Sequence, residues 1–258
     1  MSSYPLESEL NINELPRHID LKDNPEVAIN ITNITDLEQE QTIHRKIRLG
    51  FVRKVYGILS IQLLITVILC GLTFKDEVKV FMIESSGFLW LSMSLSIILS
   101  IPLLCFRSIA RKVPTNYLIL FFWTLSEAYM VACVCALYDG KTVIMAAVAT
   151  LVVTLSITLY AFYTKEDFTF LGGFLFCGVA MLLLLTIFSF FLPFLHTVIC
   201  IFGVFLYSLY LLFDTQLILG KVGNEFSLDD YVLAALCIYI DILQIFLYLL
   251  EIISRFNN

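Results

Sequence analysis

Residues 231–253 read YVLAALCIYIDILQIFLYLLEII, an apolar stretch long enough to cross a bilayer that nevertheless carries an aspartate, Asp241, near its middle. Residues three and four apart share one face of a helix. In this segment most faces are Leu, Ile and Val, but one face is small or polar at every step: Asp230, Ala234, Cys237, Asp241, Gln244, Tyr248 and Glu251. A membrane helix turns such a stripe toward protein or water rather than lipid, so we expect this segment to lie inside a helical bundle.

Six further apolar stretches precede this segment, and the whole chain is lipid-soluble in character. Hydrophobic residues make up 59% of the sequence, whereas a soluble domain has about 45–50%. Seven stretches meet the ~20-residue requirement of a membrane span: 55–74, 88–106, 117–138, 142–163, 168–192, 195–219 and 231–253. Their connectors are short. We therefore predict an all-α membrane protein, a seven-transmembrane helical bundle with the last helix central.

The N-terminal residues 1–43 differ from the rest, because they hold nine acids against two bases and lack a sustained apolar period. We predict a disordered acidic tail here, followed by a membrane domain over residues 44–258. If the spans alternate, ten Lys and Arg residues near the span ends lie on the N-terminal side and four on the other. Positive residues gather on the cytosolic side, which predicts a cytosolic N-terminus. A re-entrant last segment would return both termini to the cytosol; we favour a full span.

A second aspartate, Asp214, lies in the preceding segment within VFLYSLYLLFDTQLILG, on a face shared with Gly203 and Tyr207. The short connector makes the last two segments antiparallel, and at ~1.5 Å per residue the two aspartates lie roughly 9 and 15 Å below it. Two carboxylates in contact at low dielectric cannot both ionise easily, so the pair titrates as one unit. We predict that Asp214 and Asp241 form a pH-sensing, gating dyad that also holds Ca²⁺ transiently. The alternative is a pair of protonated acids that only bonds two helices together.

Other polar residues suggest an ion path. Its candidate members are Asp229, Asp230, Glu127 and Gln244. Asp229 and Asp230 either cap the last helix or form an acidic mouth. Arg107 and Arg111 either anchor a helix end at the headgroups or supply a counter-charge to the dyad. The sequence contains no P-loop, nucleophile elbow or paired histidines, so we expect no catalytic residue, no cofactor and no enzymatic activity.

Three motifs carry a family resemblance: IRLGFVRKVYGILSIQLLIT at 47–66, RKVPTNYLIL at 111–120, and FDTQLILG at 213–220 followed by LDDYVLAALCIYIDILQIF at 228–246. From about residue 42 to 254 the chain resembles the transmembrane Bax-inhibitor-motif family, in particular its lifeguard branch. One departure is that the family often has consecutive arginines before the Pro-x-Asn turn, where this chain has Ala110, Arg111 and Lys112. The arginine that latches the dyad in a prokaryotic relative aligns near Ala110.

The resemblance implies a pH-sensitive calcium leak of endoplasmic reticulum or Golgi membranes that lowers store calcium and suppresses apoptosis. It assigns the dyad to Asp214 and Asp241 and links Asp229 to conductance, with Ca²⁺ as the permeant ion and H⁺ as regulator. One alternative is a non-conducting interaction protein that restrains death receptors or Bcl-2-type partners. Another is an intramembrane aspartyl protease, which Asp241 fits poorly because no glycine precedes it. The expected partners include the bilayer and no nucleic acid.

Overall fold

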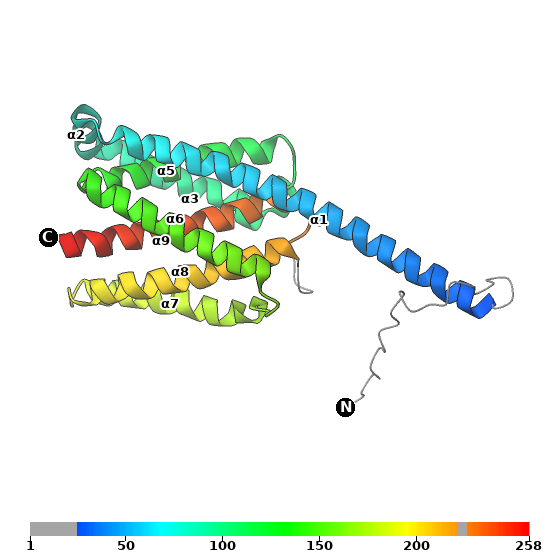
Figure 1. Ribbon diagram of the computed structural model, residues 1–258. Helices are drawn as coiled ribbons and strands as arrows, with labels where there is room; N and C mark the ends of the chain where they lie inside the picture. Colours follow the sequence, from blue (N-terminus) through cyan, green and yellow to red (C-terminus); the bar gives the residue numbers. More distant parts are fainter. Residues whose placement is uncertain (1–24, 221–225, 258) are drawn as a thin grey trace. The chain divides into compact units, whose positions relative to one another are not determined.

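A computed structural model of the chain describes residues 25–220 and 226–257, and the regular structure of these residues is helical throughout. Seven of the described helices are long and apolar enough to cross a membrane (Figure 1): α1 (Pro25–Leu72), α3 (Ser86–Cys105), α5 (Thr115–Cys135), α6 (Gly140–Tyr163), α7 (Gly172–Ser189), α8 (Leu195–Leu219) and α9 (Tyr231–Asn257). The predicted seven-span, all-α architecture is confirmed.

The predicted bounds agree to within three residues except at α7 and at the two ends of the chain. The stretch predicted as 168–192 divides into a short 3-10 turn, η2 (Thr169–Leu171), and α7, which stops at Ser189. Two short helices, α2 (Asp76–Glu84) and α4 (Arg107–Ala110), occupy connectors. Asp139 caps the start of α6 by accepting hydrogen bonds from the backbone N–H and hydroxyl of Thr142, which lowers the pKa of Asp139.

Helix α1 begins at Pro25, well before the predicted first span. Of the predicted disordered tail, residues 25–43 are therefore helical, and residues 1–24 lie outside the described part of the chain. Extending a helix from an existing span needs no new nucleus, and residues 37–48 are rich in the good helix formers Glu, Gln, Lys and Arg. Proline is also well tolerated in the first helical position.

Helix α9 is continuous over 27 residues, about 40 Å at 1.5 Å per residue. A continuous helix of this length does not fold back as a hairpin, so the re-entrant alternative is wrong. More than half of its apolar window, 56%, is buried, the largest share among the candidate spans found in the described residues. It packs against α5, α6 and α8, so the central position predicted for the last helix is confirmed.

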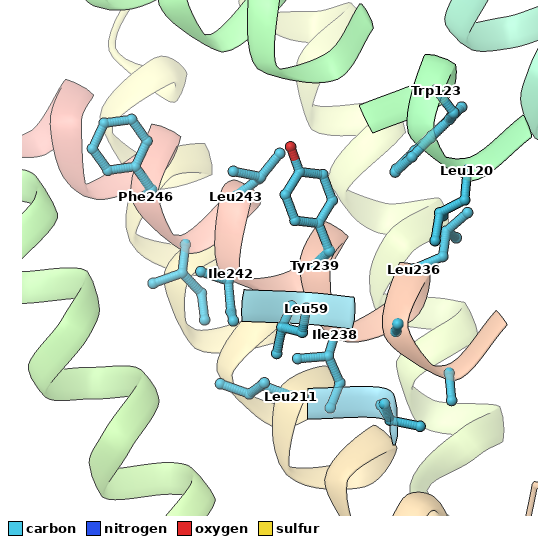
Figure 2. Packing of buried hydrophobic residues seen from close by; sticks show 14 of the residues in the cluster. Leu59, Leu120, Trp123, Leu211, Leu236, Ile238, Tyr239, Ile242, Leu243 and Phe246 are labelled. Atoms are coloured by element: carbon cyan, nitrogen blue, oxygen red, sulfur yellow. The ribbon is translucent and has the colours of Figure 1, made fainter. Parts of the chain in front are cut away.

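The core around α9 joins segments far apart in the sequence. Figure 2 shows Tyr239 and Leu236 of α9 among Leu59 of α1, Leu211 of α8 and Trp123 of α5. The Trp123 and Tyr239 rings meet edge to face with centroids 5.7 Å apart, a favoured aromatic geometry. Large apolar side chains also cover the outside of the bundle, as expected where lipid is the solvent.

Two interhelical hydrogen bonds fix the register of α1 inside this core. The hydroxyls of Thr66 and Tyr239 lie 2.7 Å apart, which joins α1 to α9. The Gln62 side-chain amide donates to the Thr124 hydroxyl at 3.0 Å, which joins α1 to α5. Polar side chains buried at membrane depth need such partners, so these bonds hold the three helices in one arrangement.

Candidate functional site

The carboxyl groups of Asp214 on α8 and Asp241 on α9 lie close enough to interact directly. Both side chains are buried, with relative exposures of 7% and 3%. The packing of α8 against α9 lets the two side chains meet, as expected from predicted depths of roughly 9 and 15 Å. An ionised carboxylate has no donor, so a hydrogen bond between two carboxyl groups requires that one of them carries a proton.

The surroundings of this pair are polar but not basic. Tyr207, Tyr210 and Cys237 lie near the two aspartates. Within the described residues, neither carboxyl group forms an ion pair with Lys or Arg. Asp241 Oδ2 has no hydrogen-bond partner in that same part of the chain. Since a buried negative charge needs compensation, a proton or a cation must supply it.

A search of the described residues finds no group of three or more His, Cys, Asp or Glu side chains arranged to hold a metal ion. Calcium prefers six to eight oxygen ligands, and two carboxyl groups provide only part of such a shell.

The arginine predicted as a counter-charge to the dyad has a different partner. Arg111 Nε lies 2.7 Å from Asp230 Oδ1, and Arg111 Nη2 lies 2.9 Å from Asp230 Oδ2. This bidentate contact lowers the pKa of Asp230, and the nearby charge of Arg107 acts in the same direction. Because Arg111 follows the short helix α4, it reaches the start of α9 and not its middle. Of the two roles considered for Arg111, the counter-charge to the dyad is not the one that this contact shows.

The same contact changes the interpretation of the acidic mouth. Asp230 immediately precedes α9, its backbone carbonyl accepts from Ala234 N, and its side chain is occupied by Arg111. Asp229 is exposed beside it and adds to the negative field around Arg111. Of the two predicted mouth residues, Asp229 is the one whose side chain faces solvent.

Glu127 on α5 accepts a hydrogen bond from the Ser96 hydroxyl on α3. The structure thus assigns Glu127 to the contact between α3 and α5, and it does not bring this residue into the dyad.

Gln244 belongs to a cleft at the other end of α9, which sequence reasoning did not foresee. The cleft has a volume of about 340 Å³ and receives residues from α5, α7, α8, α9 and the loop after α5: Val134, Tyr138, Thr186, Ser189, His196, Ile199, Cys200, Gln244, Leu247, Tyr248 and Glu251. Three of these residues continue the polar stripe of α9 beyond Asp241. The polar stripe indicated that this part of α9 faces protein or water. It could not indicate which residues of the other helices line the cleft.

Glu251 is held in place at this cleft by several groups. The Tyr138 hydroxyl donates to it, Arg255 Nε donates to its Oε1 at 3.0 Å, and His196 Nδ1 lies 3.7 Å from that oxygen. Tyr138 lies in the loop after α5, where burial is the main cause that raises its pKa and the Glu251 contact adds to it. The tyrosine therefore stays protonated and donates to the carboxylate throughout the physiological range.

Three tyrosines lead from the dyad to this cleft. The rings of Tyr210 and Tyr207 have centroids 5.8 Å apart, and those of Tyr207 and Tyr248 lie 6.0 Å apart. The Tyr248 ring lies directly over Gly203, where an added Cβ would fall only 2.5 Å from Cε2. Glycine at this position thus lets the ring seat against α8, as small residues do in membrane helix packing.

We expect Gly203→Ala to lower the free energy of unfolding by about 1–3 kcal/mol, because the new methyl group overlaps the Tyr248 ring and neither helix can yield freely. Thermal unfolding in detergent measures the change. In the double variant with Tyr248→Ala most of this cost should disappear, since the overlapping ring is gone. Equal costs in both backgrounds would contradict the close packing of the ring on Gly203.

A buried arginine near the dyad was also missed, because in the sequence it counted only as one of the positive residues before the first span. Arg48 on α1 has a relative exposure of 6%. Its Nε donates to the Ile218 carbonyl at 2.8 Å, its Nη1 to the Phe226 carbonyl at 2.7 Å, and its Nη2 to the Leu217 carbonyl. Carbonyls at a helix C-terminus lack intrahelical partners and favour positive charge. Arg48 therefore stabilises the end of α8, one turn beyond Asp214.

Comparison with known proteins agrees with this architecture. Residues 48–258 match the family described as "Inhibitor of apoptosis-promoting Bax1". The chain belongs to this family. Among similar proteins of the family, human Protein lifeguard 3 is 34% identical over 221 residues, covering 83% of this chain and 71% of its own length. LIFEGUARD 4 of Arabidopsis thaliana is 34% identical over 217 residues, covering 80% of this chain and 85% of its own length. The resemblance inferred from the three motifs is confirmed.

The family match begins at Arg48, so it includes the dyad, the cleft and the α8 clamp, by which we mean the hydrogen bonds from Arg48 to the carbonyls at the end of α8. The residues before Arg48 lie outside it. The acidic N-terminal region is therefore a feature of this chain beyond the matched domain, whereas the whole candidate site is part of the family domain.

The contribution of the Arg111–Asp230 contact to the stability of the protein should not change on mild acidification. The pKa of Asp230 is lowered, so the contact contributes fully above the ordinary aspartate pKa and is lost only as pH falls through the lowered value. We expect Asp230→Asn to reduce thermal stability by the same amount at alkaline, neutral and mildly acidic pH. A reduction that vanishes on mild acidification would show that Asp230 is already protonated there.

Proposed function

We propose that this chain is a pH-sensitive calcium leak of intracellular membranes, gated by the Asp214/Asp241 pair, and that it suppresses apoptosis by lowering store calcium. The single observation that carries the proposal is the pair of neighbouring acids, buried in the central helices without an ion pair to Lys or Arg among the described residues. A purely structural role is better served by apolar side chains or by hydroxyls, because buried acids are costly at membrane depth.

In the proposed mechanism, the protonated pair is neutral and holds α8 and α9 together, which is the closed state. Loss of the shared proton leaves two carboxylates in contact, and their repulsion at low dielectric drives them apart. The same charges then attract a divalent cation and offer it oxygen ligands. The proton and the calcium ion therefore compete for one site, and acidification closes the path.

The two ends of the site differ in a way that fits this mechanism. One end of the site lies on the same side of the membrane as the N-terminus. There Arg48 binds the last carbonyls of α8, and Arg111 binds Asp230. At the opposite end lies the cleft lined by Gln244 and Glu251. Only the row of tyrosines separates this cleft from the aspartate pair. With a cytosolic N-terminus, this cleft faces the lumen of the endoplasmic reticulum or Golgi. Calcium would reach the dyad from the lumen, and the cytosolic end would open only when the dyad separates.

A second candidate function is a non-conducting interaction protein that restrains Bcl-2-type or death-receptor partners. The family description names inhibition of apoptosis-promoting Bax1 and no transported ion, which favours this alternative. An aspartyl protease is disfavoured because both acids are buried, with Ile240 and Ile242 beside Asp241 in place of the glycine that such proteases use.

Calcium flux through the purified full-length protein in liposomes tests the proposal. We expect calcium to equilibrate faster than in protein-free liposomes and the rate to fall as the pH is lowered. Liposomes containing the same amount of another seven-span protein control for bilayer damage. Flux no faster than in these controls, from protein that remains folded, would favour the non-conducting alternative.

A further inference from the structure

Two cysteines that the proposed mechanism does not use lie in contact between the first and third spans. Cys70 is in the last turn of α1 and Cys135 is the last residue of α5, and their Sγ atoms lie 3.7 Å apart. The Cys135 side chain is almost fully buried, with 1% exposure, and Cys70 is half-buried. Both are reduced in this structure.

We propose that Cys70 and Cys135 are a redox site, a dithiol that closes to a disulfide between α1 and α5. A disulfide requires the two sulfurs to approach from van der Waals contact to about 2 Å, which a side-chain rotation accomplishes when the backbones are already close. The proposal concerns this pair alone among the described cysteines. Cys133 is two residues from Cys135 and belongs to the apolar cluster with Met82 and Ala132, against which Cys70 also packs, but the sulfur of Cys70 contacts that of Cys135.

The surrounding contacts hold the two thiols at this separation. The Gln62–Thr124 hydrogen bond joins α1 and α5 further along the same interface. Cys70 packs against the cluster of Ala132 and Ala136 on the α5 side. Since α1 and α5 are fixed to each other by a polar bond and by apolar packing, the sulfurs do not depend on a rare fluctuation to meet.

The chemistry needs an oxidant, and the fitting class is a low-molecular-weight disulfide. One thiol loses its proton and its sulfur attacks the small disulfide, which forms a mixed disulfide and releases one small thiolate that takes up the proton. The second cysteine then attacks the mixed disulfide, which forms the Cys70–Cys135 bond and releases the second small thiol. The protein dithiol is oxidised, and the small disulfide is reduced to two thiols.

The position of the pair suits this exchange. It lies within one turn of the helix ends, at the end of the bundle where Tyr138 binds Glu251, and not at the membrane centre. Under the topology proposed above, that end faces a lumen, whose redox poise permits disulfides. The bridge would also restrain the end of α5, three residues before the tyrosine that holds Glu251 at the cleft. The chemistry itself does not require ion conduction, so it stands or falls separately from the leak.

Peptide mass spectrometry on the full-length protein in lipid nanodiscs tests the site. One sample is equilibrated with oxidised glutathione and one with reduced glutathione, and the remaining thiols are alkylated after denaturation. In the oxidised sample we expect a cross-linked peptide pair containing Cys70 and Cys135, lighter by two hydrogen atoms, with Cys133 alkylated. In the reduced sample all three should be alkylated.

Two variants make the assignment specific. Cys133→Ser should leave the cross-link unchanged, whereas Cys70→Ser should abolish it, and Cys135→Ser should do the same from the other side. The proposal is overturned if both cysteines remain alkylated after oxidation. It is also overturned if each carries its own glutathione, or if Cys135 pairs with a different cysteine.

Discussion

Replacing Asp214 by Asn is expected to remove most of the pH dependence of calcium flux in liposomes and to keep the rate low at every pH. In the native chain, opening is linked to the loss of one shared proton, so flux should change by up to about tenfold per pH unit in the titrating range. The asparagine amide donates permanently to Asp241 and needs no proton to do so. The closed arrangement of α8 and α9 is then retained without a titrating group on α8.

A matched control is Asp76→Asn, which removes one carboxylate from the exposed first turn of α2. It changes the net charge of the protein by the same amount and should leave both the rate and its pH response unchanged. If Asp214→Asn conducts with the native pH profile, the dyad is not the gate. In that case the buried acids act only as a bond between two helices.

The second large effect is expected for Arg48→Met, which keeps the length of the side chain and removes its donors. The carbonyls of Leu217, Ile218 and Phe226 then lose a partner in a region where water enters with difficulty. A buried polar group left unsatisfied costs about 1–3 kcal/mol, so we expect a loss of about 3 kcal/mol or more in the free energy of unfolding. Thermal unfolding and the monodisperse yield after purification measure it.

The control for this variant is Arg53→Met, which lies on the same helix and is exposed. Its removal should change stability little, because exposed charges on a helix surface contribute little to stability. A loss as large in Arg53→Met as in Arg48→Met would mean that positive charge near the membrane surface matters, and that the clamp on α8 does not.

Much of this architecture follows from local patterns along the chain. The seven spans were predictable because each is a long apolar run, and lipid requires such runs to form helices. The central position of α9 was predictable from one polar face around Asp241. The level of Asp214 relative to Asp241 followed from counting residues to a short connector, since helical rise is constant.

Contacts between side chains on separate helices could not be predicted in this way. Arg111 was a candidate partner of the dyad, but the short helix α4 directs it to Asp230. Arg48 resembled an ordinary interfacial base, although it is buried against the end of α8. For both arginines, the sequence predicted the charge and its approximate depth in the membrane. The partner of each depended on how the neighbouring helices are rotated about their axes.

The amino-acid sequence by itself determined which segments enter the membrane, which helix is surrounded by the others, and where two acids occur at the same depth. It could do so because hydrophobic periodicity and helical rise are properties of each segment alone. Only the tertiary structure decided which groups neutralise each charge, where the cleft opens, and that Cys70 meets Cys135. These features depend on the relative rotation of packed helices, which is set by the fit of many side chains together.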